Sequence, residues 1–219
     1  MAQRSYQDAC GAARAMDIVG ERWALLIVRE LVFGPKRFGD LRAGLPKASQ
    51  NVLSQRLREL EQAGIVRRIQ LGPPASVYAY ELTGRGHQLE PMLIELSRWG
   101  AGLPEEPDTE MSTDAFMLLL KALYRPPADA PLTARLALRV GTDAFDVGVT
   151  PDAITVARGR TSEVEATVTG TVAALRDLMF GGTPLRSAIS SGTIEVRGDI
   201  GTAERFFRLF SAPPNGETD

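Results

Sequence analysis

The 219-residue sequence predicts a two-domain protein, with a mainly α-helical N-terminal domain and a C-terminal α+β domain built on a largely antiparallel sheet. Three observations predict this fold class. Helical patterns dominate the first hundred residues, alternating strand patterns begin at Leu132, and a Gly, Pro and acidic stretch at residues 100 to 112 separates them. We therefore expect domains at residues 1 to 103 and 130 to 212, with a linker and connecting helix at 104 to 129.

Charge is distributed unevenly between the two halves of the chain. Residues 1 to 103 hold 14 Lys and Arg against 10 Asp and Glu, whereas residues 104 to 219 hold 11 against 17, for a net charge of −2. Between residues 34 and 85 there are nine basic and four acidic residues. Such a local excess of positive charge is typical of a surface that binds phosphates.

Composition argues against several other classes of protein. No apolar run reaches the roughly 18 residues that a membrane helix needs, and the N-terminus lacks the apolar core of a signal peptide, so we expect a cytoplasmic protein. The single cysteine, Cys10, and the single histidine, His87, rule out a disulfide framework and a Cys/His zinc site. The sequence has no phosphate-binding glycine loop and no catalytic pair, so we expect no metal, no cofactor and no enzymatic activity.

The elements expected in the N-terminal domain follow a defined order. The sequence predicts a helix ending near Val19, a hydrophobic helix over residues 22 to 33, a short helix within 38 to 45, and a helix over 49 to 63. Two β-rich segments at 65 to 71 and 76 to 82 flank a proline-rich turn, and a last amphipathic helix covers 83 to 100. This is the order of a winged helix-turn-helix, which places one helix in the major groove of DNA.

The helix over residues 49 to 63 has two distinct faces. At 100° per residue Leu53, Leu57 and Leu60 form an apolar stripe, and Ser49 occupies the N-cap position. The opposite face carries Asn51, Ser54, Gln55, Arg58 and Gln62. Amides, hydroxyls and guanidinium groups pair with base edges in the major groove. We interpret Asn51, Ser54, Gln55 and Arg58 as base-reading residues, with a merely solvated face as the alternative.

Basic residues flank this helix in the sequence. The residues that we expect to contact DNA phosphates are Lys36, Arg37, Ser49, Arg67, Arg68 and Arg85. Each cation alone is typical of an ordinary surface, but the cluster is spaced to reach the phosphates on either side of a helix bound in the groove.

Several residues and short motifs in the first hundred residues match the pattern of a known protein family. They are Cys10, Trp23, the Gly-Pro-x-Arg-Phe at 34 to 38, Arg56-Leu57, Tyr80, Leu82-Thr83, Gly86, Pro91 and Trp99. With them, residues 8 to 100 resemble the HxlR-type winged-helix transcriptional regulators. The resemblance implies a two-fold dimer, with residues 49 to 58 as the recognition helix and 72 to 76 as the wing tip. Two positions depart from the family pattern, because Gly11 replaces a usual proline and Asn51 a frequent lysine.

A two-fold dimer implies a pseudo-palindromic operator whose half-sites lie about 34 Å apart, roughly one turn of DNA. We expect two dimer surfaces, on the first and last helices. Their apolar residues are Ala12, Ala13, Met16, Leu89, Leu93, Leu96 and Trp99. Core packing within the subunit is the alternative for these side chains, and Leu93 and Leu96 could serve both purposes.

Two further residues are candidates for chemistry. A cysteine near the N-terminus of the HxlR-type regulators is sometimes a redox switch, so the resemblance makes Cys10 a candidate redox site. The chain has no second cysteine to resolve an oxidised thiol, and an inert, half-buried Cys10 is the alternative. His87 lacks a matched acid or cysteine, and we interpret it as a surface or interface residue.

The C-terminal domain begins with four strand patterns, continues with helices near 171 to 182 and 184 to 190, and ends with a strand at 193 to 199 and a helix at 200 to 210. Residues 130 to 210 resemble the sterol carrier protein type 2 superfamily, through the segments at 166 to 182, 192 to 199 and 203 to 210. The resemblance implies a tunnel for an apolar ligand. Its expected lining is Leu175, Leu178, Met179, Phe180, Ile189, Phe206 and Phe210, for which simple core packing is the alternative.

Together these observations predict a sequence-specific transcriptional regulator that binds double-stranded DNA as a homodimer on a pseudo-palindromic operator. The C-terminal domain is expected to sense an apolar small molecule or acyl effector, or to act as an oligomerisation scaffold, and no membrane contact is expected. The alternative is a lipid or small-molecule carrier whose winged helix serves protein contacts. A steep salt dependence of DNA affinity would distinguish the regulator from the carrier.

Overall fold

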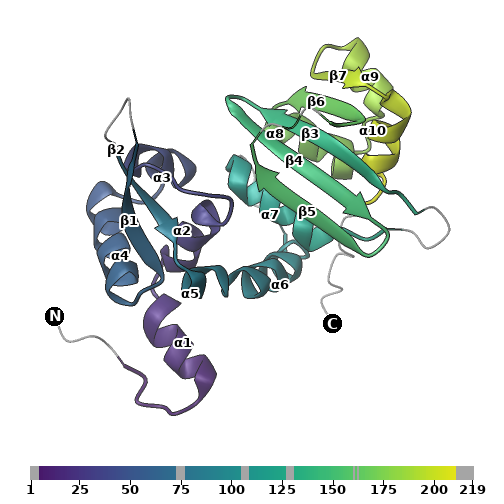
Figure 1. Cartoon of the computed structure of the whole chain (residues 1–219). Helices are drawn as coiled ribbons and strands as arrows, with labels where there is room; N and C mark the ends of the chain where they lie inside the picture. Colours follow the sequence, from purple (N-terminus) through teal and green to yellow (C-terminus); the bar gives the residue numbers. More distant parts are fainter. Residues whose placement is uncertain are drawn as a thin grey trace. The chain divides into compact units, whose positions relative to one another are not determined.

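The computed structural model describes residues 5 to 72, 77 to 104, 109 to 126, 131 to 159, 161 and 163 to 210. The chain divides into two compact units, Met1–Leu93 and Ile94–Asp219 (Figure 1). Within these described residues, no helix is both long and apolar enough to cross a membrane.

The described residues of the first unit form helices, a hairpin and a helical turn. Its elements are α1 (Gly11–Val19), α2 (Ala24–Leu31), α3 (Phe38–Gly44), α4 (Gln50–Gln62), β1 (Val66–Leu71), β2 (Val77–Leu82), α5 (Gly84–His87) and the start of α6 (Glu90–Gly100). β1 and β2 pair antiparallel. Lys36 joins the outer edge of β2, because its amide donates to the Tyr80 carbonyl at 2.9 Å and the Tyr80 amide donates to the Lys36 carbonyl at 2.8 Å. This is the predicted element order of a winged helix-turn-helix.

The apolar core of this unit forms where α2, α3 and α4 meet the hairpin. Ile27, Leu31 and Leu41 are completely buried, and the predicted stripe of Leu53, Leu57 and Leu60 is at most 1% exposed. Burying a leucine side chain contributes roughly 1.5–3 kcal/mol, so the stripe fixes which face of α4 is turned outward.

The predicted single helix over residues 83 to 100 is instead two helices. Thr83 caps α5, since its hydroxyl accepts from the Gly86 amide at 3.1 Å and donates to the Gly64 carbonyl at 2.6 Å. Gly86 is required there, because a Cβ would lie 2.3 Å from the Ile65 carbonyl oxygen. α6 then starts afresh with Pro91 in its first turn, where the missing amide costs no helical hydrogen bond.

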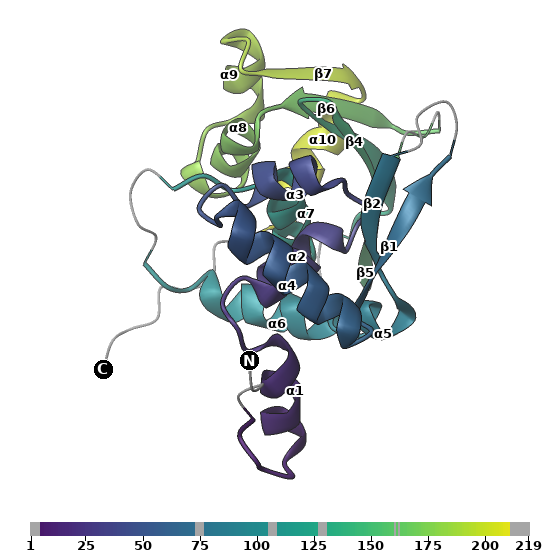
Figure 2. The same ribbon diagram turned by 90° about the vertical axis from the view of Figure 1, so that its left-hand side faces the viewer.

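In the part of the second unit that the structure describes, helices cover a five-stranded sheet. Its elements are the remainder of α6, α7 (Thr113–Leu123), β3 (Ala134–Val140), β4 (Asp143–Thr150), β5 (Ala153–Arg158), β6 (Ala166–Gly170), α8 (Val172–Arg176), the π-helix η1 (Asp177–Gly181), α9 (Leu185–Ser190), β7 (Ile194–Gly198) and α10 (Ile200–Phe207). The strand order is β5-β4-β3-β6-β7. The 90° turn between the two views shows α8 and α10 on the same face of this sheet (Figure 2).

The sheet is mixed, which corrects the prediction of a largely antiparallel sheet. β3–β4, β4–β5 and β6–β7 are antiparallel, but β6 pairs parallel with β3, at the centre of the sheet. Alternation of apolar residues identifies β6 as a strand without identifying its neighbour. After β5 the chain crosses to the other side of β3 instead of continuing the meander.

α7 belongs to the core of the second unit. Seven of its 11 residues are buried, including the charged Asp114. The Arg158 guanidinium of β5 donates to both Asp114 carboxylate oxygens, at 2.6 and 2.7 Å. The sequence suggested a connecting helix between domains, whereas α7 is a packed layer. The boundaries at residues 103, 130 and 212 stay predictions.

Candidate nucleic-acid interface

α4 begins and ends at well-defined residues. Ser49 has an extended backbone, and its hydroxyl accepts a hydrogen bond from the Val52 amide at 3.4 Å, which satisfies one of the free amides of the first turn. At the other end Gly64 takes a φ of +70°, a conformation that glycine adopts without strain. The hydroxyl of Ser49 therefore already has a partner as the N-cap.

The outward face of α4 presents the predicted base-reading residues together. Asn51, Gln55 and Arg58 are exposed, and Ser54 is half-buried. The Gln55 amide nitrogen donates to the Glu59 carboxylate at 2.9 Å. Its amide oxygen and second N–H remain able to meet another partner, as base recognition by glutamine requires.

Arg56 holds α4 in place and was not identified from the sequence as a site residue. Its side chain is only 16% exposed, and it pairs with Glu59 on the same helix and, at 2.9 Å, with Glu21 ahead of α2. The Arg-x-x-Glu spacing indicates the first contact, but only the fold brings Glu21 near. Arg56 is therefore a positioning residue for the exposed face.

The cations predicted to contact phosphates divide into two groups. In the first group, three side chains form an ion pair or a hydrogen bond within the protein. The Lys36 ammonium lies 2.7 Å from the completely buried Glu30 carboxylate. Arg67 forms an ion pair with Glu81 at 2.5 Å. Arg85 donates to the Ala63 carbonyl at 3.2 Å, at the C-terminal end of α4.

In the part of the chain that the structure describes, the side chains of the second group form no ion pair, although the Asp40 carboxylate accepts from the backbone amide of Arg37 at 3.1 Å. Arg37 and Arg68 are exposed, as is Arg58 on α4, and within the described residues no carboxylate pairs with any of the three side chains. Arg68 lies with its guanidinium carbon 3.8 Å from the centroid of the Tyr78 ring. The predicted wing tip lies outside the described residues, except for Gly72.

Comparison with known proteins identifies the family. Residues 18–107 match the family model described as HxlR-like helix-turn-helix. The HTH-type transcriptional regulator YvaP of Bacillus subtilis is 43% identical over 86 residues, which cover 39% of this chain and 80% of YvaP. The chain belongs to the HxlR-like helix-turn-helix family.

Other relatives extend the comparison. The HTH-type transcriptional regulator YodB of Bacillus subtilis is 38% identical over 95 residues, covering 43% of this chain and 85% of YodB. A solved structure of the reduced form of YodB is 35% identical, covers 46% of this chain and 100% of that chain, and has a TM-score of 0.39. Residues 118–211 match a second family model, the SCP-2 sterol transfer family. The HxlR-like and SCP-2 matches together span both units.

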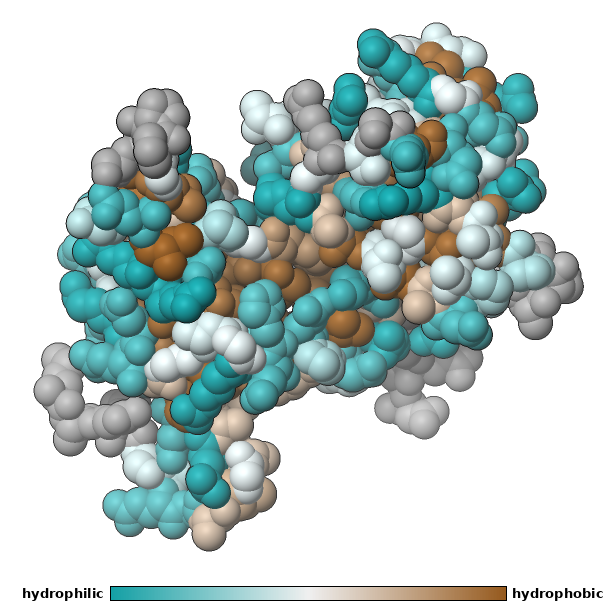
Figure 3. Space-filling view, in the orientation of Figure 1, coloured by the Kyte–Doolittle hydropathy of each residue, from teal (hydrophilic) through white to brown (hydrophobic). Residues whose placement is uncertain are grey.

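The surfaces predicted to form the HxlR-like dimer differ in exposure. On α6, Leu93 is 3% exposed and fills the core, whereas Leu96 and Trp99 are 47% and 68% exposed. On α1, Met16 is 36% exposed, and moderately hydrophobic residues reach the surface of this helix (Figure 3). Leu96, Trp99 and Met16 therefore remain available for contact with a second subunit.

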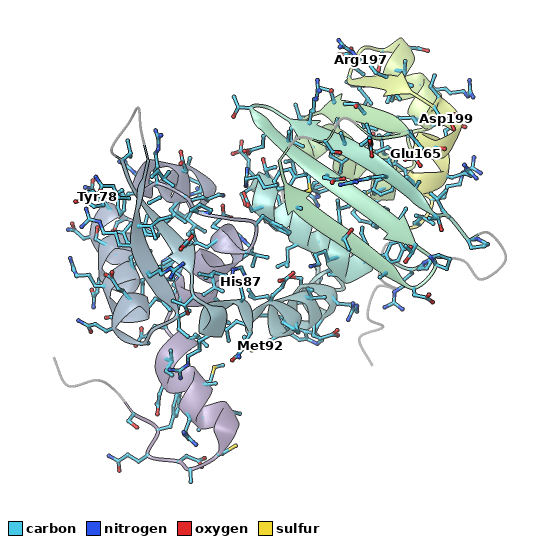
Figure 4. The ribbon with its side chains drawn as sticks, in the orientation of Figure 1. Tyr78, His87, Met92, Glu165, Arg197 and Asp199 are labelled. Atoms are coloured by element: carbon cyan, nitrogen blue, oxygen red, sulfur yellow. The ribbon has the colours of Figure 1, made fainter. Side chains whose placement is uncertain are left out.

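Cys10 is exposed, which differs from the half-buried alternative. Backbone hydrogen bonds from Ala12 and then Ala13, at the start of α1, lower the pKa of its thiol. His87 is exposed on α5 and labelled in Figure 4. Among the described residues, no group of three or more His, Cys, Asp or Glu side chains is arranged to hold a metal ion.

The expected ligand-lining residues of the SCP-2-like unit lie on the helical side of the sheet. Leu175, Met179, Phe206 and Phe210 are buried, and Leu178, Phe180 and Ile189 are half-buried. The Phe206 ring lies edge-on to Phe210 at a centroid distance of 5.1 Å. These contacts are those of a packed core, with three apolar side chains reaching its surface.

A hollow of about 390 Å³ lies on the opposite face of the same sheet. Its floor is made of small residues, including Gly148, Ala153 and Ala157, and the exposed Arg135 pairs with Asp146 at its side. None of the seven expected ligand-lining residues contributes to this hollow.

Proposed function

We propose that this HxlR-like protein is a homodimeric transcriptional regulator that binds a pseudo-palindromic operator through α4 of each subunit. The observation that carries the proposal is the outward face of α4. Asn51, Gln55 and Arg58 are exposed there, on a helix whose other side is fixed by buried leucines and by Arg56. Fixed polar groups on a protruding helix are what major-groove recognition requires.

The residues have separate roles in this proposal. Asn51 and Gln55 pair with adenine and Arg58 with guanine, because their donors and acceptors match those base edges, and Ser54 adds a hydroxyl. Arg37 and Arg68 contact phosphates on either side, since their charges are not neutralised within the described residues. Arg67, Arg85 and the Ser49 hydroxyl remain secondary phosphate contacts.

Lys36 is better assigned to the domain core than to DNA. Its ammonium group compensates the completely buried Glu30 carboxylate at 2.7 Å. Moving it to a phosphate would leave that carboxylate with less compensation in a buried site, which is costly. We therefore omit Lys36 from the proposed interface.

Selection of duplexes from a randomised pool by the full chain tests the proposal. Asn51→Ala, Gln55→Ala and Arg58→Ala should each weaken binding to the selected duplex by about 5-fold to 150-fold. On an unrelated duplex of equal length, Asn51→Ala and Gln55→Ala should have little effect. Gln62→Ala, exposed at the end of the same helix, is the matched control.

Salt dependence separates a regulator from a carrier. The logarithm of affinity should fall with the logarithm of salt concentration by about 0.9 for each phosphate neutralised. Weak binding with a flat salt dependence for every duplex would contradict DNA recognition. Footprints of a single unsymmetric half-site bound by monomer would contradict the dimer.

We further propose that the SCP-2-like unit binds an apolar small molecule or acyl chain that changes operator affinity. Leu178 and Phe180 lie on the π-helix η1, an irregular element frequent at functional sites, and both are half-buried. In this unit the Arg98 side chain of α6 donates to the Ala122 carbonyl of α7 at 2.8 Å. α6 also carries Leu96 and Trp99, so a shift of α7 would reach the proposed dimer surface.

A ligand changes operator affinity only if it binds two states of the dimer unequally. A fluorescent long-chain fatty acid should therefore bind the full chain and shift its affinity for the selected duplex. Phe180→Glu should weaken uptake of the probe, and Thr155→Glu, on the opposite sheet face, should not. Absence of uptake would favour an oligomerisation scaffold.

A further inference from the structure

Arg67 and Arg68 are adjacent in β1 but have different surroundings. Side chains alternate between the faces of a strand, so the two arginines point to opposite sides of the hairpin. Arg67 lies directly opposite Glu81 in the register and pairs with it at 2.5 Å. Arg68 lies on the other face, with its guanidinium carbon 3.8 Å from the Tyr78 ring centroid.

The register explains the contact between Arg68 and Tyr78. Arg68 is opposite Tyr80 and Gln70 is opposite Tyr78, so Arg68 and Tyr78 are diagonal neighbours on one face. Long and aromatic side chains reach each other across such a diagonal. Tyr78 is 53% exposed, and Figure 4 labels it on the hairpin of the first unit.

Stacking changes what Arg68 can do. A guanidinium held over an aromatic face keeps its charge, and its N–H groups can still donate at the rim of the ring. The side chain also loses less conformational entropy when it binds, because the ring already restricts it. Within the described residues no carboxylate neutralises Arg68, in contrast to Arg67.

We propose that Tyr78 is a positioning residue that holds the Arg68 guanidinium ready to contact a DNA phosphate beside the site read by α4. The inference rests on the proposed function and adds one supporting residue, Tyr78, to the proposed interface. Arg68 makes the contact, and Tyr78 acts through Arg68. Arg67, whose charge Glu81 already compensates, contributes less.

A double-mutant cycle on the full chain tests this role, with fluorescence anisotropy on a mixed-sequence duplex and on the selected duplex. Tyr78→Ala should weaken binding about 2-fold to 5-fold for each subunit, the size of one exposed cation–π contact. In a chain that already carries Arg68→Ala, the same change should have almost no effect. Tyr78→Phe keeps the ring face and should bind as the wild type does.

Arg68→Ala should also lower the slope of log affinity against log salt by about 0.9 for each subunit. Arg67→Ala is the matched control and should lower it less. Tyr78→Leu removes the ring but keeps an apolar strand residue, so it should behave like Tyr78→Ala if both variants fold, as circular dichroism would check.

Equal losses from Tyr78→Ala with and without Arg68 would overturn the positioning role, because Tyr78 would then act independently. Wild-type affinity in Tyr78→Ala would overturn it too, and would leave the proposed function intact if Arg58→Ala still weakens binding to the selected duplex. Absence of salt-dependent binding by the wild-type chain would overturn both proposals.

Discussion

At the scale of single residues, Cys10 makes the most direct chemical prediction. Amides of Ala12 and Ala13 at the start of α1 lower the pKa of its exposed thiol. A lowered pKa leaves more thiolate at pH 7 than an ordinary cysteine has, and the thiolate is the reactive form. The pH midpoint of alkylation by iodoacetamide should therefore lie below that of the same chain in denaturant, where Cys10 is the single thiol. Equal midpoints in the two states would contradict this.

The cations show how far residue-scale prediction reaches from the sequence. Composition and position indicated a basic region between residues 34 and 85, but they treated Lys36, Arg67 and Arg68 alike. The partners of the first two, Glu30 and Glu81, are 6 and 14 residues away in the chain. Long-range partners are set by the packing of α2 and the register of the hairpin. No local pattern distinguishes a neutralised cation from an available one.

At the scale of elements, the periodicity of the sequence predicted the orientation of a helix and the presence of strands. It did not predict how the strands pair. The stripe of Leu53, Leu57 and Leu60 predicted the orientation of α4, because helical geometry fixes which residues share a face. The strands of the second unit were also recognisable by alternation. Their order was not, since β6 could pair with either β5 or β3, and the choice depends on the crossover and on helix packing.

The contact of α7 with β5 supplies a prediction about stability. Asp114→Ala should destabilise the second unit by about 2 kcal/mol, since the Arg158 guanidinium, 25% exposed, loses its bidentate partner but keeps its ion pair with Asp143. The corresponding calorimetric transition of the full chain should fall by roughly 10 °C. Glu195→Ala removes the exposed partner of Arg197 and should change the transition little. Similar small shifts for both variants would mean that the buried pair does not stabilise the unit.

At the scale of the whole molecule, the two dominant features are a basic N-terminal half and an acidic C-terminal half. Residues 1 to 103 carry four more basic than acidic residues, and residues 104 to 219 carry six more acidic than basic residues. Attraction of DNA is therefore local to the HxlR-like domain, while the acidic half disfavours non-specific contact with a polyanion. Such a division is consistent with the proposed selective binding at an operator, and it gives the proposed dimer contact an added part in affinity.

Dimerisation through α6 gives the last prediction. Trp99→Asp places a charge on a side chain that is 68% exposed in the single chain and that we propose to be covered by a second subunit. The wild-type chain should sediment at twice its mass of 23.7 kDa, and the variant should sediment as a monomer. Binding of one α4 helix to its half-site would then no longer raise the local concentration of a second α4 helix at the other half-site. Operator affinity should therefore fall by about 100-fold or more. Leu103→Asp, a comparable change at an exposed apolar residue beyond α6, is the control. A dimeric Trp99→Asp chain with wild-type affinity would place the subunit contact on another surface, such as α1 with its exposed Met16.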